Sequence, residues 1–518
     1  MSWRKEVEGI EQRRRLAAEL GGKEAVAKQH DLGRLTIRER IDGLLDASSF
    51  EEQGPIAGYS ELGEDGEVGS FTPANYVMGL GRIEDRPVVV GGEDFTLRGG
   101  SPTPAGLRKS VFAETLAVRF RLPLVRFLQG GGGSVMGASG RGRQPAAAPS
   151  QSEHRFLSIA QAMATAPVVS AAVGAVAGFP AARLVASHLA IMTRHTSQVM
   201  VAGPAVVERA MKESLTKEEL GNASIHERNG VVDIVVEDEA EAADTIRRFL
   251  SYLPTNVFEL SPRSDCDDPR DRCEEMLLSE VPRERRHVYN MRRIIKAVVD
   301  RDSFFEMGPL YGRSQITGLA RLDGRPVGVW ANDPHFYAGA MGADGSRKIR
   351  RFVDFCEAFH LPVVALVDEP GFMIGSAAEQ AATIRYGTEA MFATVQSTVP
   401  WASVIVRKTF GVAAAAHFGP DAFRLAWPSA EAGALPIEGG VAVAFRREIA
   451  AAPDPEAKRR ELEEALVRRQ NPYAGAEAFA VHDLIDPRRT RPVLCDWLDW
   501  VQLRLRQQLG IRTHTIRP

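Results

Sequence analysis

The feature that most constrains the fold of this 518-residue chain is an internal repeat. Four sets of matching residues recur later in the chain, all at the same separation of 239 positions. A separation that stays constant over several anchors, with similar hydrophobic patterns between them, indicates an internal duplication. The matching sets are Arg86-Pro87-Val88 and Arg325-Pro326-Val327, Asp94 and Asp333, Lys109 and Lys348, and Leu122-Pro123 and Leu361-Pro362.

Two further pairs continue the repeat at a slightly shorter separation. Pro167 matches Pro400 and Gly178 matches Gly411, both at 233 positions, so the second half has lost six residues between the two sets of anchors. Each half then predicts strand, strand, helix, strand, Gly-rich turn, helix, strand, turn and helix. Because strands and helices alternate, we expect the α/β class.

The chain is too long for one hydrophobic core, so we expect two domains. Residues 251–286 are rich in Pro, Asp and Arg and have no sustained apolar period, which favours a boundary there. The predicted domains are therefore 1–255 and 285–518.

Helices are predicted at both ends of the chain. An apolar stripe in a charged background predicts a helix over 4–29, and Thr36 followed by Glu39 predicts a capping box that opens a second helix at 36–45. The charged segment 456–470 predicts a solvated helix.

Composition excludes several classes of protein. The chain is 44% apolar and 25% charged with a net charge of −3, which gives no reason to expect a nucleic-acid partner. Its four cysteines contain no CxxC pair, which argues against a zinc ribbon or a disulfide framework. The uncharged run 157–182 is interrupted by Pro and Gly, so we expect helix, strand and turn in a core and no membrane partner.

The N-terminal residues are charged where a signal peptide requires an apolar segment. We therefore expect a cytoplasmic protein. The mitochondrial matrix stays open as an alternative, although no transit peptide is recognised.

The stretch VIVRKTFGVAAAA at 404–416 is the first candidate site. A short β-branched strand leads through a turn ending at Gly411 into an Ala-rich helix. The first backbone N–H groups of such a helix lack partners within it, and two of them together can bind an oxyanion. The alternative is an ordinary strand-to-helix connection in a core.

The first half contains a second candidate turn. The strand predicted at 122–129 leads into four glycines and Ser134, which would let a ligand approach the backbone closely. The alternative is a flexible linker, because Gly, Ala, Pro and Ser continue to residue 152.

The repeat allows the two halves to be compared turn by turn. Gly131 aligns with Pro370, and Ala413 aligns with Pro180. Because proline has no N–H, the first half would keep an oxyanion site only at its first turn, and the second half only at its second turn. Two different sites imply two reacting partners.

Other motifs narrow the chemistry. No GxSxG elbow, Walker A motif or suitably placed GxGxxG occurs, and the histidines lack metal-ligand spacing. Asp368 and Glu369 follow a predicted strand and could be a general acid or base, although solvated carboxylates ahead of a Pro-Gly turn are the commoner case. Lys212 sits in a near match to a biotin-acceptor site, but its helical surroundings indicate a surface lysine. A biotin must then come from another chain.

Long segments of the chain resemble one known family. They are RLTIRERIDGLLDASSFEE near the start, GGS at 99–101, AVVDRDSFFEMGP at 297–309, and then LVDEPGF, STVPWASVIVRKTFG and AWPSAEAGAL. They are similar to the carboxyltransferase (beta) subunit of biotin-dependent acyl-CoA carboxylases, of the propionyl-CoA carboxylase type. The resemblance covers nearly the whole chain.

This resemblance implies two tandem crotonase-like (ClpP/crotonase) domains, with acyl-CoA on the first and carboxybiotin on the second. The active site would lie between the first domain of one subunit and the second domain of another. The implied reaction moves CO2 from carboxybiotin to the α-carbon of an acyl-CoA. Biotin would arrive on a biotin carboxylase/biotin carrier (alpha) subunit, and the chain would form a hexamer built from dimers. A decarboxylase using the same site, or an inactive scaffold, remains open.

The resemblance also implies roles for individual residues. Gly131 and Gly132 would hold the thioester oxygen, and Val412 and Ala413 the ureido oxygen of biotin. No metal is implied. Cofactor-binding positions would be Gly100, Ser101, Phe410 and Gly411, and Gly133, Ala414 and Ala415 would line the substrate pocket.

The chain departs from the family at both turns. The family usually has Ser-Gly-Gly-Ala-Arg at the first and Tyr-Gly-Gly-Ala-Tyr at the second, whereas this chain has GGGGS and FGVAA. Ala415 is commonly Asp or a branched residue in the family. The small residues at Ala414 and Ala415 predict an acyl group larger or more branched than propionyl.

Overall fold

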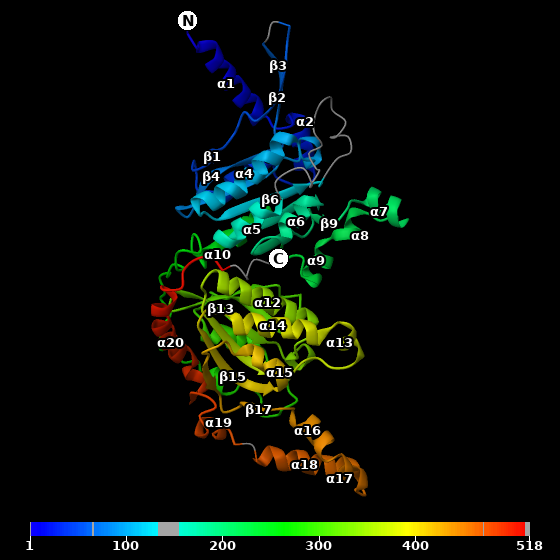
Figure 1. The fold of residues 1–518 in the computed structure, drawn as a ribbon, viewed down its shortest axis with the longest axis vertical. Helices are drawn as coiled ribbons and strands as arrows, with labels where there is room; N and C mark the ends of the chain where they lie inside the picture. The colour runs from blue at the N-terminus through cyan, green and yellow to red at the C-terminus, as the bar shows by residue number, and fades with distance from the viewer. Residues whose placement is uncertain (1, 65–66, 133–154, 470, 513–518) are drawn as a thin grey trace. The chain divides into compact units, whose positions relative to one another are not determined.

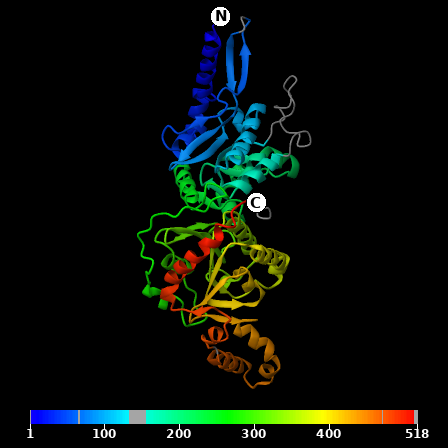
Figure 2. The same ribbon diagram turned by 60° about the vertical axis from the view of Figure 1, so that its left-hand side comes forward.

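The computed structural model describes residues 2–64, 67–132, 155–469 and 471–512. The chain divides into two compact units at Glu259 and Leu260 (Figures 1 and 2). Near the C-terminus the chain returns to the first unit, where the N–H of Gly510 donates to the carbonyl oxygen of Val257 at 2.9 Å.

Unit 1 is built on one sheet of eight strands in the order β1-β4-β5-β6-β7-β8-β10, with β9 paired to β7. The β1–β4 and β4–β5 pairs are antiparallel, and the remaining pairs are parallel. A separate antiparallel hairpin is formed by β2 and β3. The strands are β1 (Glu51–Glu52), β2 (Gly58–Leu62), β3 (Val68–Pro73), β4 (Tyr76–Ile83), β5 (Arg86–Glu93), β6 (Leu124–Gly130), β7 (Val168–Ala177), β8 (Leu189–Thr193), β9 (Gln198–Met200) and β10 (Ile234–Val236).

Helices of unit 1 pack on this sheet. Among them, α4 packs on β4 and β5 and against α5, while α3, which also contacts β4 and β5, packs against α10. The run 157–182, expected to form helix, strand and turn, forms the end of α5, then β7, then a turn at Gly178 that leads directly into α6. The helices are α1 (Arg4–Ala18), α2 (Lys23–Asp31), α3 (Ile37–Leu44), α4 (Pro104–Phe120), α5 (Arg155–Thr165), α6 (Phe179–Val185), α7 (Pro204–Met211), α8 (Lys217–Gly221), α9 (Ala223–Asn229) and α10 (Glu239–Ser251).

The N-terminal helices agree only in part with the sequence prediction. The Thr36 capping box is present and opens α3. The single helix predicted over 4–29 is wrong, because the chain breaks between α1 and α2 at two glycines. Gly22 has φ 88°, and a Cβ on Gly21 would clash with the carbonyl oxygen of Thr96. A helix continuing through this point would lose that close approach.

Unit 2 repeats the sheet of unit 1. Its eight strands run in the order β11-β12-β13-β14-β15-β16-β18, with β17 paired to β15. The antiparallel and parallel pairs follow the same pattern as in unit 1, including the parallel pair at the edge strand β18. The strands are β11 (Phe305–Met307), β12 (Gln315–Leu322), β13 (Arg325–Asn332), β14 (Val363–Glu369), β15 (Trp401–Phe410), β16 (Phe423–Ala426), β17 (Glu431–Gly433) and β18 (Asp483–Leu484).

Helices cover both faces of this second sheet. One face, which includes Val327 and Val329, shares a hydrophobic cluster with α11 and α20. On the other face, α12 approaches β13 so closely that a Cβ on Gly328 would meet the Sγ of Cys356 at 2.5 Å. The helices are α11 (Met291–Val298), α12 (Ala343–Ala358), α13 (Ser376–Gln380), α14 (Thr383–Gln396), α15 (Gly411–Ala414), α16 (Ile437–Ala444), α17 (Arg446–Ala451), α18 (Pro455–Arg469), α19 (Ala474–Glu477) and α20 (Thr490–Leu505).

Local details confirm the duplication. The β6–β7 pair shifts register between Leu128 and Gly130, and the β14–β15 pair shifts between the matching residues Val367 and Glu369. The repeat also begins earlier than the sequence comparison found. The carboxylate of Asp46 accepts from the N–H groups of residues 84 and 85, and that of Asp300 accepts from those of residues 323 and 324. Asp46 and Asp300 are 254 positions apart, so the different offset hid this part of the repeat.

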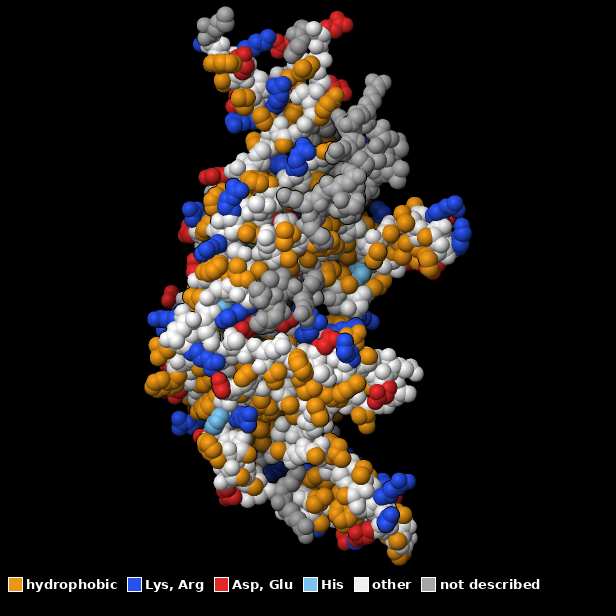
Figure 3. Space-filling model, in the orientation of Figure 1, with side chains coloured by type: hydrophobic (Ala, Val, Ile, Leu, Met, Phe, Trp, Pro, Cys, Tyr) orange, Lys and Arg blue, Asp and Glu red, His pale blue; other side chains and the backbone are white. Residues whose placement is uncertain are grey.

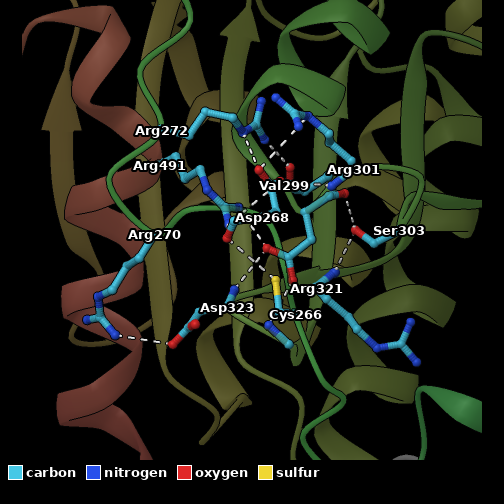
Figure 4. Close-up of polar contacts among 12 residues, drawn as sticks. Cys266, Asp268, Arg270, Arg272, Val299, Arg301, Ser303, Arg321, Asp323 and Arg491 are labelled. Carbon is cyan, nitrogen blue, oxygen red and sulfur yellow. Dashed lines mark hydrogen bonds and ion pairs between the residues drawn. The ribbon is translucent and has the colours of Figure 1, made fainter.

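The segment that follows residue 260 is fastened to unit 2 (Figure 4). Arg491 of α20 donates to the Oδ1 of Asp300 at 2.7 Å and to the carbonyl oxygen of Pro269 at 2.9 Å. Arg272 donates to the carbonyl oxygen of Val299 at 2.7 Å. These bonds tie an irregular stretch of chain to the end of α11 and to α20. In the described ranges, none of the helices is both long and apolar enough to cross a membrane.

Candidate active site

The turn after β15 has the geometry that the sequence predicted. Gly411 has φ 65°, a left-handed conformation that favours glycine, and its counterpart Gly178 has the same φ. The backbone N–H groups of Val412 and Ala413 donate to no other residue that the structure describes. Val412 is exposed, whereas the side chain of Ala413 is buried. Two N–H groups at the start of a helical turn are therefore available to a ligand.

The matching turn of unit 1 lacks one of these donors. Gly178 precedes α6, and Pro180 occupies the first turn of that helix, with its ring buried. Proline has no N–H, so this turn offers one donor fewer than the turn after β15.

The first turn of unit 1 follows β6. Within the described part of the chain, the N–H groups of Gly131 and Gly132 have no hydrogen-bond acceptor. A Cβ on Gly132 would lie 2.8 Å from the Cα of Gly178, so the first and second turns of unit 1 touch at this point. Gly133, predicted to line the substrate pocket, and Ser134 lie outside the described residues.

Gly100 and Ser101 lie beside this first turn. A Cβ on Gly100 would clash with the carbonyl oxygen of Gln129, at the end of β6. The Oγ of Ser101 lies 3.8 Å from the position of a Cβ on Gly131. Asn75 fixes this loop, because its Nδ2 donates to the carbonyl oxygen of Ser101 at 2.6 Å. The structure therefore brings together the four predicted site residues of unit 1 that it describes.

The first turn of unit 2 is closed to a ligand. Pro370 replaces Gly131 and removes one N–H. The next donor, the N–H of Gly371, is already bonded to the Oε1 of Glu369 at 3.0 Å. Within the described residues, each unit thus keeps one turn with two available donors, and the two turns are different ones.

The predicted site residues of unit 2 differ in solvent exposure, which decides which of their side chains can contact a ligand. Gly411, Val412 and Ala415 are exposed, whereas the side chains of Phe410 and Ala414 are buried. Phe410 and Ala414 can therefore support the turn from within, and Ala415 is free to contact a bound molecule.

The expectation that Asp368 and Glu369 are solvated is wrong, because both side chains are fully buried. Asp368 accepts from the Tyr289 hydroxyl at 2.8 Å and from the N–H of Lys408 at 3.0 Å. The Nη2 of Arg407 lies 3.3 Å from the same carboxylate. Asp368 is thus fully used in holding β14 to the end of β15.

Glu369 connects the two turns of unit 2. Its Oε2 lies 3.3 Å from the Nε2 of His417, which follows α15, and accepts from the Nδ2 of Asn332 at 3.0 Å. Burial raises the pKa of Glu369 to about 8 and lowers the pKa of His417 to about 3. Near neutral pH the pair is therefore an uncharged acid beside an uncharged imidazole. The sequence placed Glu369 at a strand end but held no signal for the elements that cover it.

No group of three or more His, Cys, Asp or Glu side chains in the described ranges is arranged to hold a metal ion.

Comparison with known proteins identifies the family. The sequence model of the family described as Carboxyl transferase domain matches residues 28–514. The chain belongs to the carboxyl transferase family. The resemblance inferred from the sequence and the tandem crotonase-like fold are thereby confirmed, and the protein is a carboxyltransferase.

The relatives of this carboxyltransferase extend over most of its length. The propionyl-CoA carboxylase carboxyltransferase subunit of Haloferax mediterranei is 32% identical, over 95% of each chain. The human mitochondrial propionyl-CoA carboxylase beta chain is 34% identical, over 95% of this chain and 90% of its own. The methylmalonyl-CoA decarboxylase subunit alpha of Veillonella parvula is 32% identical, over 92% of each chain.

Solved structures agree with this assignment. A transcarboxylase 12S structure, a hexamer with methylmalonyl-coenzyme A and methylmalonic acid bound, superposes with a TM-score of 0.85 at 31% identity. The match covers 97% of this carboxyltransferase and 96% of that chain. A single-chain, multi-domain long-chain acyl-CoA carboxylase has a TM-score of 0.81 at 30% identity, covering 96% of this chain and 49% of its own.

Proposed function

We propose that this carboxyltransferase moves CO2 from carboxybiotin to the α-carbon of an acyl-CoA. The proposal rests on one observation: each unit has lost a backbone N–H donor at one of its two turns, and the two units have lost it at different turns. Unit 1 keeps two N–H groups at Gly131 and Gly132, and unit 2 keeps two at Val412 and Ala413. The first pair would hold the thioester oxygen as it becomes an enolate, and the second would hold the ureido oxygen of biotin.

The residues of the second turn fit a ureido oxygen, because two available amides of one helical turn can converge on a single acceptor. Carboxybiotin, when its carrier delivers it, supplies both the CO2 and the base for the α-proton. The chain itself contributes oriented N–H groups, exclusion of water and a fixed position for the acyl group. Asp368 and Glu369 are buried beneath the turns and act by holding them, not by transferring protons to the substrate.

For the substrate, we propose an acyl group larger or more branched than propionyl. Ala415 is exposed at the second turn and has only a methyl side chain. A small residue at that position leaves more room for the acyl group than the bulkier residues common in the family.

For the assembly, we propose a hexamer built from dimers that binds a biotin carboxylase/biotin carrier (alpha) subunit. Hexamer assembly is reported for the transcarboxylase 12S relative. Large apolar side chains exposed on the single chain support buried subunit contacts, among them Val201 at 96% and Ile374 at 90% exposure. On the face drawn in Figure 3, hydrophobic side chains lie between charges of both signs on each unit.

One comparison also supports the reverse reaction, decarboxylation of a carboxylated acyl-CoA. The methylmalonyl-CoA decarboxylase subunit alpha is as similar to this chain as the carboxylase subunits are. The same two oxyanion sites would serve decarboxylation, because forward and reverse reactions pass through the same transition states.

The test is co-purification with a biotin carboxylase, followed by an assay that depends on ATP and bicarbonate over a panel of acyl-CoA thioesters. Carboxylation of at least one thioester supports the proposal. Release of CO2 from a carboxylated thioester, without net carboxylation of any acyl-CoA, favours the decarboxylase. A complex that forms and binds CoA esters but turns over none of them favours the inactive scaffold.

A further inference from the structure

A small pocket in unit 1 opens beside the first turn. It has a volume of about 30 Å³ and is lined by Gly100 and Gly132 together with Tyr76, Glu93, Ser110 and Arg183. This space holds a group the size of a carboxylate or a water molecule but not a long alkyl chain.

Arg183 is the unusual member of this lining. Its side chain is only 3% exposed, and its Nε donates to the Oε1 of Glu114 at 2.8 Å. Its Nη2 is buried and has no hydrogen-bond partner among the described residues. A buried charged donor without a partner is costly, so the free N–H indicates an absent acceptor.

The carboxylate that pairs with Arg183 also pairs with a second buried arginine. Glu114 is shared, because the Nη1 of Arg126 also donates to its Oε1 at 3.4 Å. Arg126 is otherwise satisfied by the hydroxyl of Ser170 and by the carbonyl oxygens of residues 183 and 186. Two buried guanidinium groups therefore face one carboxylate.

The other acidic residue of the pocket, Glu93, forms no hydrogen bond or close ion pair with Arg183 in the described structure. Glu93 is buried and accepts from the N–H of Gln129 at 3.2 Å. Burial raises the pKa of Glu93, which favours its uncharged form. Burial likewise raises the pKa of Tyr76, so its hydroxyl stays protonated and can donate to a ligand.

The duplicated scaffold does not need these polar residues in order to fold. The position of Arg183 is taken in unit 2 by Ala416, and that of Glu93 by Asn332. Both replacements are buried in unit 2, whose sheet has the same strand order. The cationic pocket is therefore confined to the unit whose first turn carries the two available donors.

We propose that this pocket selects acyl-CoA thioesters whose acyl chain ends in a carboxylate, and that Arg183 is the residue that binds this carboxylate. The inference rests on the proposed function, because it takes the thioester oxygen to lie at Gly131 and Gly132. An acyl chain of a few atoms would then place its end in the pocket. The carboxylate supplies the acceptor that Nη2 lacks and balances the second guanidinium.

The test compares two thioesters that differ only at the chain end. Butyryl-CoA ends in a methyl group where succinyl-CoA has a carboxylate. Calorimetric affinities are measured without a biotin carrier for the parent, Arg183→Met and Arg183→Lys, each shown to assemble as the parent does. We expect the parent to bind succinyl-CoA at least about tenfold more tightly than butyryl-CoA, the contribution of a hydrogen bond to a charged group. Arg183→Met should remove this preference, and Arg183→Lys should keep part of it.

A second variant guards against misfolding. If Arg183→Met alone does not assemble, the double variant Glu114→Gln/Arg183→Met removes one charge of each sign and takes its place. If the parent binds butyryl-CoA as tightly as succinyl-CoA, the inference is overturned. It is also overturned if Arg183→Met keeps the preference for succinyl-CoA, because Nη2 would then bind only water. In both cases thioesters still bind and the proposed function stands. Failure of the parent to bind any CoA thioester removes the proposed function and this inference together.

Discussion

Single backbone donors distinguish the four turns of this carboxyltransferase. Pro180 and Pro370 each remove an N–H at a turn where the other unit has one, at Ala413 and Gly131. These two differences between the units decide which turn can bind an oxyanion. Side-chain chemistry is secondary at these positions, because the reacting groups would meet main-chain amides.

Replacing Ala413 with Pro tests the donor at the second turn. The matching position in α6 already holds a proline in the first helical turn, so we expect Ala413→Pro to fold. Loss of one oxyanion donor costs about 3 kcal/mol, so the carboxylation rate should fall about a hundredfold. Affinity for the acyl-CoA should be nearly unchanged, because the thioester would lie against the other pair of amides.

Ala413→Ser is the matched control, because it changes the side chain but keeps the N–H, and it should react at a rate close to that of the parent. Carboxylation rate and acyl-CoA affinity are measured on variants of normal assembly. A proline variant whose rate stays within a few-fold of the parent would falsify the assignment of the biotin oxygen to this turn.

Ala415 tests the acyl pocket. Ala415→Ile adds bulk at an exposed position of the second turn, so we expect preference to shift toward shorter acyl chains. Each methylene is worth about 1 to 3 kcal/mol in such a pocket, so the shift should be about tenfold or more per carbon. The measurement is kcat/KM over a chain-length series. An unchanged chain-length profile would show that Ala415 does not contact the acyl group.

The raised pKa of Glu369 predicts that the folded protein loses stability as the pH rises toward 8. Its pKa is raised to about 8 in the folded state, against an ordinary value of 4.5. The folded state therefore holds its proton more tightly, and the stability that this proton contributes is present below pH 4.5 and is lost as the pH rises to about 8. Glu369→Gln cannot lose a proton, so between pH 5.5 and 8 the parent should lose about 1 kcal/mol or more relative to the variant.

Urea unfolding of parent and variant at the two pH values measures this difference. The comparison is made between pH values, because the amide also changes the hydrogen bonds to Asn332 and His417 by an amount that does not depend on pH. The depressed pKa of His417 acts in the opposite window, with stability lost as the pH falls from 6.5 toward 3. Equal losses in parent and Glu369→Gln between pH 5.5 and 8 would mean that Glu369 is already ionised in the folded protein.

At the scale of elements, the two turns of unit 1 form one structural piece. Gly132 after β6 and Gly178 before α6 approach so closely that neither has room for a Cβ. The position of the first pair of amides is therefore set by two strands and a helix together. In unit 2 the corresponding connection is made by side chains, through Glu369 and His417.

A pair of alanine substitutions tests this contact. In Gly132→Ala the new Cβ would lie 2.8 Å from the Cα of Gly178 and 2.9 Å from the backbone nitrogen of Phe179, so the turns must separate. In Gly131→Ala the nearest neighbour is the Oγ of Ser101 at 3.8 Å, an ordinary contact. We expect Gly132→Ala to weaken acyl-CoA binding about tenfold or more, and Gly131→Ala to bind nearly as the parent does. Calorimetric titration with an acyl-CoA measures both, and equal affinities would contradict the close contact.

At the scale of the whole molecule, two copies of one sheet carry different polar residues. The cationic pocket with Arg183 belongs to unit 1, and the buried Glu369–His417 pair belongs to unit 2. The ionic cluster of Figure 4 belongs to unit 2, where it holds the segment after residue 260 against α20. Duplication supplied the common framework, and later substitutions gave each unit its own chemistry.

Arg491→Met tests the role of that cluster. It removes the partner of the buried carboxylate of Asp300 and releases the carbonyl oxygen of Pro269. Breaking a buried ion pair from one side typically costs about 3 to 5 kcal/mol, so we expect unit 2 to unfold at lower temperature. Limited proteolysis should then cut between residues 260 and 290, and Arg504→Met, at an exposed pair on the same helix, serves as the control. Unchanged proteolysis in Arg491→Met would show that the segment is held by its other contacts.

The sequence by itself determined the duplication, the α/β class, the order of elements in each half and the glycines and prolines at the turns. These features are local, because a strand, a capping box or a missing N–H depends on a few neighbouring residues. The prediction that 4–29 is one helix failed although Gly21 and Gly22 were visible, since the decisive contact is with distant Thr96. The earlier part of the repeat, at Asp46 and Asp300, was hidden by its different offset.

Only the tertiary structure decided which polar residues are buried and what they contact. The sequence predicted that Asp368 and Glu369 are solvated. They are buried because residues distant in the chain, His417 after α15 and Tyr289, lie against them at the end of β14. Nothing in the sequence singled out Arg183. Its bond to Glu114 and its unpaired N–H arise only when α6 lies against α4 in the folded unit. Burial raises or lowers a pKa through the loss of water, and which groups lose water is a property of the packed molecule.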